Sequence, residues 1–191
     1  MISASGSESG GSGTIASGGY NFPFGFPVDG GSTGLIQTGI AKLSMFVPSI
    51  GMTVAALAYD VTGATGCTSG TPCELAFGLY NSAGGLLAQK LAAVTATGAF
   101  LVSFSPSIPL TASSVYYFAW TSDSVNVALQ AAGGGSLLFS ELANLNGFRA
   151  GTALSGVSGS GAGLTLPAAS GGIIAQSGAY AAAPAIGFFV Q

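Results

Sequence analysis

The chain has 191 residues, of which three are basic and six are acidic, and its mean hydropathy is +0.64. Histidine is absent, which excludes mechanisms that need an imidazole base or an imidazole zinc ligand, including Ser-His-Asp and Cys-His catalysis. Three basic residues are too few for a nucleic-acid or anionic-membrane surface, so neither partner is expected. No cofactor motif is visible, and the length fits one domain.

The low charge does not indicate a membrane helix. A spanning helix needs roughly 20 consecutive apolar residues, and the most apolar charge-free stretch, 172–190, is interrupted by Gln176, Ser177 and Pro184. Residues 1–13 have neither a basic segment nor an apolar segment, so no signal peptide is evident. We therefore expect a protein made and folded in a cytoplasm.

Residues 1–19 are typical of a flexible arm, because Gly and Ser dominate and almost nothing could be buried. A segment that cannot order itself is most simply ordered by a neighbour. We expect an assembly arm whose contacts come from Ser3, Ser5, Ser7, Ser12 and Ile15.

From Tyr20 onward the chain predicts a single all-β domain over 20–191. Aromatic residues at positions 20, 22, 24 and 26 have the period of an extended strand, and two nearby prolines confine it to an edge. The apolar runs that predict further strands are 35–47, 52–61, 75–80, 86–91, 99–104, 115–120, 125–129 and 185–190.

The connections between these runs have turn signals. Residues 81–85 join two runs into a β-hairpin, and the proline-rich stretch 106–114 predicts a turn. Residues 136–146 fit either a short helix or a strand followed by a turn.

Short strands at roughly ten-residue intervals, with turns between them, are typical of an antiparallel β-sandwich. If the last strand pairs beside the early ones, the sandwich closes in a jelly-roll-like form. The strand positions expected to face outward hold Ala, Ser, Gly and Thr, where independent domains usually carry charge. Such a surface favours an oligomer or a repeating lattice.

Cys67 and Cys73 lie six residues apart in a loop marked by Gly70 and Pro72. Two thiols cannot form a structural zinc site without further Cys or His ligands. A small disulfide loop and a pair of reduced thiols are both compatible with the sequence.

Three segments, taken in order, resemble β-sandwich structural proteins of tailed-phage virions. They are YNFPFGFP at 20–27, FGLYNSAGGLL at 77–87 and LTASSVYYFAWTSD at 110–123. The resemblance also includes the short segment LTLP at 164–167. The sequence departs from the family pattern at Ser113-Ser114, where that pattern carries Gly, and in the insertion between the two cysteines.

The resemblance implies a structural virion protein, associated with the tail or fibre or decorating the capsid, and it transfers no catalytic residues. Its partners would be copies of itself and other capsid or tail proteins. Its location would be the virion, assembled in the host cytoplasm.

A second hypothesis is a carbohydrate- or receptor-binding module that recognises a host-surface glycan. In that case Tyr80, Tyr116, Tyr117 or Trp120 would stack on a sugar face, whereas the alternative for these rings is packing in the core or at an interface. Aromatic side chains that point into the sandwich would speak against the binding hypothesis.

A glycosidase needs two carboxylates across one cleft, and the candidates are Asp60, Glu74, Asp123 and Glu141. The first three could instead ligate a hard cation. Isolated acids near turns are more often solvated or capping, so we expect no enzyme activity and no metal site.

Overall fold

The computed structural model describes residues 20–21, 40–48, 51–130, 152–168, 173–175 and 187–190. The strands in these ranges are β1 (Tyr20–Asn21), β2 (Ile40–Phe46), β3 (Met52–Ala64), β4 (Cys73–Asn81), β5 (Leu86–Val94), β6 (Gly98–Leu110), β7 (Tyr116–Ser122), β8 (Val127–Leu129), β9 (Thr152–Ser155), β10 (Ile173–Ala175) and β11 (Gly187–Val190), with a single 3-10 turn, η1 (Gly161–Gly163). The predicted arm, including Ser3, Ser5, Ser7, Ser12 and Ile15, and the candidate helix at 136–146 lie outside the described residues.

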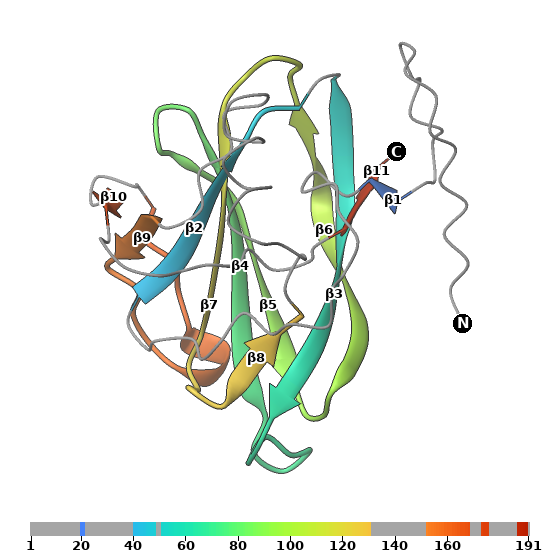
Figure 1. Ribbon diagram of the computed structural model, residues 1–191, viewed down its shortest axis with the longest axis vertical. Coiled ribbons are helices and arrows are strands. Elements are labelled where there is room, and N and C mark those ends of the chain that lie inside the picture. Colours follow the sequence, from blue (N-terminus) through green and yellow to red (C-terminus); the bar gives the residue numbers. More distant parts are fainter. Residues whose placement is uncertain are drawn as a thin grey trace, which may run out of the picture.

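The strands form two antiparallel sheets, which face each other in Figure 1. The first sheet has the order β1-β11-β3-β6, with β8 also paired to β3, and the second has the order β10-β9-β2-β7-β4-β5. The predicted all-β sandwich is therefore confirmed.

The last strand closes the sandwich against the first. In β11, Phe189 lies opposite Tyr20 of β1 and Ala56 of β3. When β1 to β7 and β11 are counted one to eight, the two sheets read 1-8-3-6 and 2-7-4-5, which is the strand order of a jelly roll. Strands β9 and β10 extend the second sheet beyond β2.

The space between the sheets is filled by the alternate, inward-pointing residues of the strands. Phe77 and Phe118, on neighbouring strands, stack with ring centroids 5.9 Å apart, and Tyr59 of the opposite sheet lies 4.8 Å from Phe77. Fully burying a large apolar side chain stabilises a fold by about 1.5–3 kcal/mol. The period-two pattern of these residues is therefore the main physical reason for the sandwich.

Strand β6 is longer than the sequence indicates. Residues 106–110 were expected to begin a turn, yet β6 continues to Leu110 and pairs Pro109 with Thr53 of β3. Prolines are tolerated there because β6 is an edge strand, where one side of the backbone has no ladder partner.

The register of β6 changes at a bulge. Val54 of β3 lies opposite Ile108, but Ala56 lies opposite Ser103. One β3 residue, Ala55, therefore faces the four β6 residues 104–107. This bulge shapes the outer surface described below.

The turn between β6 and β7 contains a serine in the left-handed backbone region. Ser113 has a φ of 61°, and its N–H donates to the carbonyl of Pro48 at 2.8 Å. This is the place where the phage-like pattern carries Gly. Glycine reaches this conformation without the steric cost that a Cβ imposes.

We predict that Ser113→Gly raises the free energy of unfolding by up to about 1 kcal/mol, since removing Cβ relieves more strain than the added chain entropy costs. The matched control is Ser114→Gly, at a neighbouring serine that is not in the left-handed region; it should lower stability. Denaturant unfolding of both variants checks this. Equal effects of the two substitutions would contradict the prediction.

Candidate functional site

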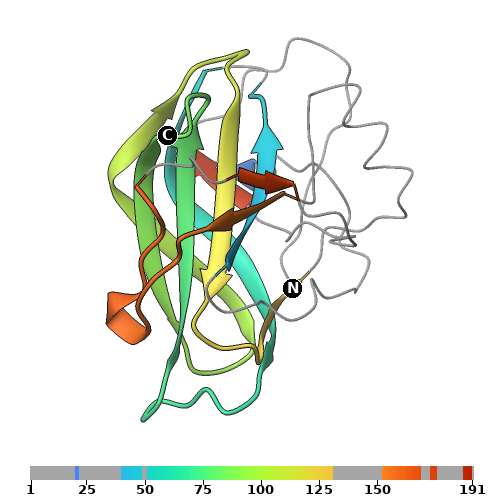
Figure 2. The same ribbon diagram turned by 90° about the vertical axis from the view of Figure 1, so that its left-hand side faces the viewer.

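The outer face of the second sheet is covered by residues 156–168, which we call the strap. Figure 2 shows the strap, in orange, running across the outer side of this sheet. Leu164 and Leu166 of the strap are buried against outward-facing residues of the sheet, namely Ala41, Leu43, Ala76, Tyr80 and Ala119. This face is therefore closed by the chain itself.

Polar contacts fix the position of the strap. The Gln89 side chain donates to the carbonyl of Leu164 at 3.0 Å and accepts from the N–H of Leu166 at 2.8 Å, so that it imitates a strand partner. A Cβ on Gly78 would lie 2.5 Å from Leu166. A side chain at position 78 would therefore require the Leu166 side chain of the strap to shift.

The structure does not bring the four candidate aromatic residues to an open surface. Tyr80 is fully buried under the strap, where its hydroxyl donates to the carbonyl of Pro167 at 2.8 Å. Burial raises the pKa of Tyr80 to about 12. A ring held in this way has no face free for a sugar.

The other three aromatic residues lie on β7. Tyr116 and Trp120 point into the sandwich and are buried, and the Tyr116 hydroxyl accepts a hydrogen bond from the N–H of Thr111 at 2.9 Å. Tyr117 points outward and is half-buried against the strap side of the sheet. The proposed stacking role of Tyr80, Tyr116 and Trp120 is therefore not available in this structure, because these rings are needed for packing.

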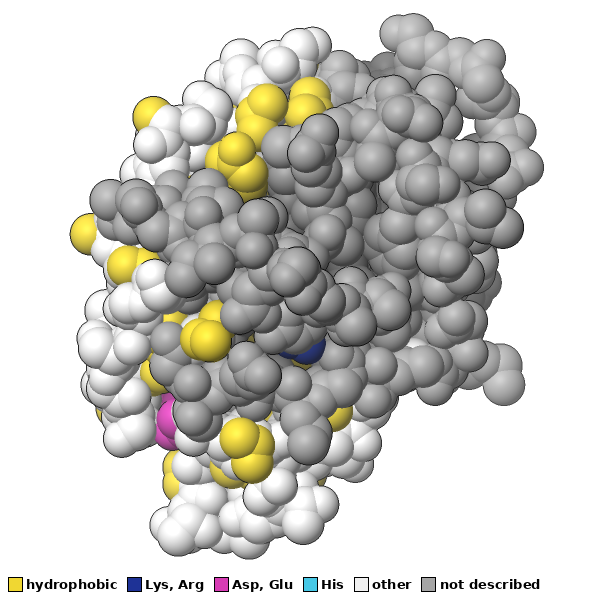
Figure 3. Space-filling model, turned by 60° about the vertical axis from the view of Figure 1, so that its left-hand side comes forward, with side chains coloured by type: hydrophobic (Ala, Val, Ile, Leu, Met, Phe, Trp, Pro, Cys, Tyr) yellow, Lys and Arg dark blue, Asp and Glu magenta, His cyan; other side chains and the backbone are white. Residues whose placement is uncertain are grey.

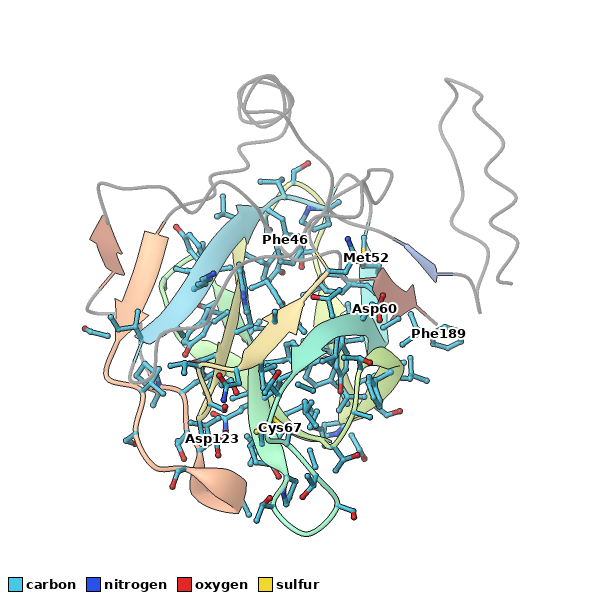
Figure 4. The ribbon with its side chains drawn as sticks, turned by 60° about the horizontal axis from the view of Figure 1, so that its bottom comes forward. Phe46, Met52, Asp60, Cys67, Asp123 and Phe189 are labelled. Carbon is cyan, nitrogen blue, oxygen red and sulfur yellow. A yellow bond between two sulfur atoms is a disulfide. The ribbon has the colours of Figure 1, made fainter. Side chains whose placement is uncertain are left out.

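Asp123 and Glu74 come together at the lower end of the sandwich, with Asp123 labelled in Figure 4. The Asp123 carboxylate accepts from the N–H of Glu74 at 2.8 Å and from the N–H of Gly161, in the strap, at 2.7 Å. Each oxygen of the Asp123 carboxylate thus accepts a hydrogen bond from a backbone N–H group. Asp123 thereby joins β4 and the strap to the end of β7. Asp60 lies elsewhere, on β3. Glu141 lies outside the described residues.

The environment of Glu74 changes its ionisation. Burial, followed by repulsion from Asp123, raises the pKa of Glu74 above its ordinary value of 4.5. Burial, with a smaller effect from the nearby negative charge of Glu74, raises the pKa of Tyr59 to about 12. Within the described part of the chain, no group of three or more acidic or cysteine side chains is arranged to hold a metal ion.

Two features of the described residues were not foreseen from the sequence. Lys42 of β2 is buried, and burial lowers the pKa of its amine. Two hollows flank the β6 bulge, and the exposed residues Leu87 and Leu101 contribute to them. The sequence signal that could have indicated these hollows is the presence of Leu87 and Leu101 at strand positions that face outward.

The first hollow opens on the outer face of the first sheet. It has a volume of about 610 Å³ and is lined by residues of β3, β6 and β11, among them Ala56, Leu101, Ser103 and Phe189. Figure 4 shows the Phe189 side chain pointing away from the core. None of the described residues that line it is charged.

The second hollow lies at the open side of the sandwich between the edge strands β5 and β6. It has a volume of about 460 Å³, and Lys90 is the single charged residue among the described ones that line it. Leu87 and Pro109 lie on its two walls. Both hollows share the bulge residues 104–107, so this segment separates them.

No protein-family model, no curated protein and no solved structure matches this chain. Among the described residues, no helix has the length and hydrophobicity needed to cross a bilayer. The candidate site is therefore defined by its geometry and chemistry alone.

The two cysteines form a disulfide in the structure, with the Cα atoms 5.2 Å apart. Cys67 is buried in the main core, and Cys73 packs against the same core at the start of β4. The bond closes the loop between β3 and β4.

We predict that replacing both residues, Cys67→Ala with Cys73→Ala, lowers the free energy of unfolding by about 2 kcal/mol, because a closed loop of this length restricts the unfolded chain. Unfolding with and without reductant measures the effect, and reductant should destabilise the wild type only. A thiol assay on the unfolded, unreduced protein is the control. Two reactive thiols in that assay would contradict the disulfide.

The raised pKa of Glu74 predicts a pH-dependent stability. The folded state binds the Glu74 proton more tightly than the unfolded chain does. The stability gained from this difference is fully present below the pKa of Glu74 in the unfolded chain, and it is lost as the pH rises through the pKa of Glu74 in the folded state. Glu74→Gln should therefore raise the melting temperature at about pH 7 relative to wild type and change it little at about pH 3. Equal shifts at both pH values would contradict this assignment.

Proposed function

We propose that this chain is a structural protein of a tailed-phage virion, which assembles with copies of itself and with other capsid or tail proteins and catalyses no reaction. The observation that carries the proposal is the scarcity of charge on the outside of a jelly-roll sandwich. Jelly rolls are used by viral capsid and lectin domains. This is an argument from architecture, so the chemistry of the surface has to support it.

The described surface is unusually poor in charge. Of the five charged residues in the described ranges, Lys42 is buried, and the Asp123 carboxylate is occupied by the backbone N–H groups of Glu74 and Gly161. Figure 3 shows a face whose described atoms are mostly hydrophobic or uncharged polar, with little dark blue or magenta. Surfaces of independent domains normally carry charges of both signs to limit association. An exterior of this kind suits permanent packing against neighbours.

The chemistry of the described acids is also consistent with a structural role. Asp123 binds two backbone N–H groups, and these contacts hold the strap against the sandwich. A glycosidase would need two carboxyl groups facing a substrate across a cleft. In this structure both oxygens of the Asp123 carboxylate are instead occupied by backbone N–H groups of β4 and the strap.

We predict that the purified chain forms oligomers or larger arrays, which light scattering combined with size-exclusion chromatography measures. A chain lacking residues 1–19 should keep the folded sandwich, as judged by its thermal unfolding, and assemble more weakly. Antibody labelling of purified virions would then locate the protein on the head or the tail. A stable monomer at high concentration, together with absence from the virion, would overturn the proposed function.

A further inference from the structure

The large hydrophobic side chains that stand exposed gather mainly in one region. Among the described residues, the exposed ones are Leu87, Leu101 and Val125, with exposed fractions of 43%, 55% and 47%. Leu101 lines the outer-face hollow and Leu87 lines the edge hollow, whereas Val125 lies apart, in the turn between β7 and β8. Such residues gain stability when a partner removes their apolar surface from water.

The bulge in β6 gives this region its shape. Phe104 points into the core and holds the bulge in place, while Ser105 and Pro106 are exposed. Because residues 104–107 line both hollows, the exposed part of the bulge stands between them as a wall. We call Ser105, Pro106 and Ser107 the ridge.

A ridge beside a hollow is a shape that can bind its own copy. In a twofold contact the same patch is used by both subunits, so the ridge of each copy can enter the hollow of the other. A foreign partner would need a separately matched surface. The two halves of this reciprocal contact are already present on one chain.

The chemistry of the outer-face hollow fits the same occupant. The described residues that line it are Ala, Ser, Leu, Phe and Pro, none of them charged, and the ridge itself is uncharged. Two copies can therefore meet without burying an unpaired charge, which would be costly. Nucleic acid and acidic peptides require positive groups that this hollow does not offer.

We propose that the outer-face hollow and the ridge form a twofold interface with a second copy of this chain, the ridge of each copy seated against Leu101 and Ser103 of the other. This proposal rests on the proposed function, since it names the partner and the surface through which assembly begins. Small residues at Ala56 and Ser103 leave room for the incoming ridge.

The test places a carboxylate in the contact. Leu101→Glu should weaken self-association at least about tenfold, because a charge would be buried without a partner. Its matched control is Val125→Glu, which makes the same kind of change at an exposed apolar residue outside both hollows and should leave association unchanged. Analytical ultracentrifugation over a concentration series measures both, and thermal unfolding verifies that each variant is folded.

A second pair of variants avoids removing any apolar contact. Ser103→Glu adds charge at an exposed residue of the outer-face hollow, and Ser69→Glu adds it at an exposed residue of the disulfide loop. The first should weaken association and the second should not. If the wild type associates and neither Leu101→Glu nor Ser103→Glu weakens it, this interface is overturned and the proposed function stands. A monomeric wild type would instead overturn this interface, and the proposed function would fall as well if the protein were also absent from the virion.

Discussion

The contact between Phe118 and Phe188 joins the two sheets and makes the rest of the fold possible. The Phe118 ring on β7 lies 6.1 Å from the Phe188 ring on β11, and it also stacks on Phe77 and Trp120 at 5.9 Å each. The terminal strand is therefore anchored in the core from the opposite sheet. With β11 fixed, it can pair with both β1 and β3, which closes the jelly roll.

Features that depend on neighbouring residues could be predicted from the sequence, and features that depend on distant ones could not. The hairpin of β4 and β5 and the strand β7 occur where alternation and turn residues indicate them. The sequence left both ligand binding and packing open for Tyr80, because nothing near it reveals that a strap 87 residues away covers it. Pro106 and Pro109 indicated a turn, since their tolerance in β6 depends on β6 being at the edge of its sheet, a long-range property.

Of the five charged residues that the structure describes, two have roles inside the molecule. Asp123 holds the strap through two backbone N–H groups, and Lys42 is buried on β2. Asp60 lies on β3 and Lys90 on β5, in different sheets. Low charge thus has two effects here: it permits a covered outer face on one sheet, and it leaves an uncharged outer-face hollow on the other.

The edges of the sandwich determine what kind of association this surface can support. An unprotected edge strand pairs with edges of other chains and gives open-ended aggregation. Strand β6 carries Pro106 and Pro109 and a bulge, which disrupt continuous pairing, and Lys90 lies on β5 at the same open side. With strand addition disfavoured, the exposed apolar residues can be buried only by side-chain packing of one face on another. A twofold contact of that kind closes on itself, so a further interface is required before a lattice can grow.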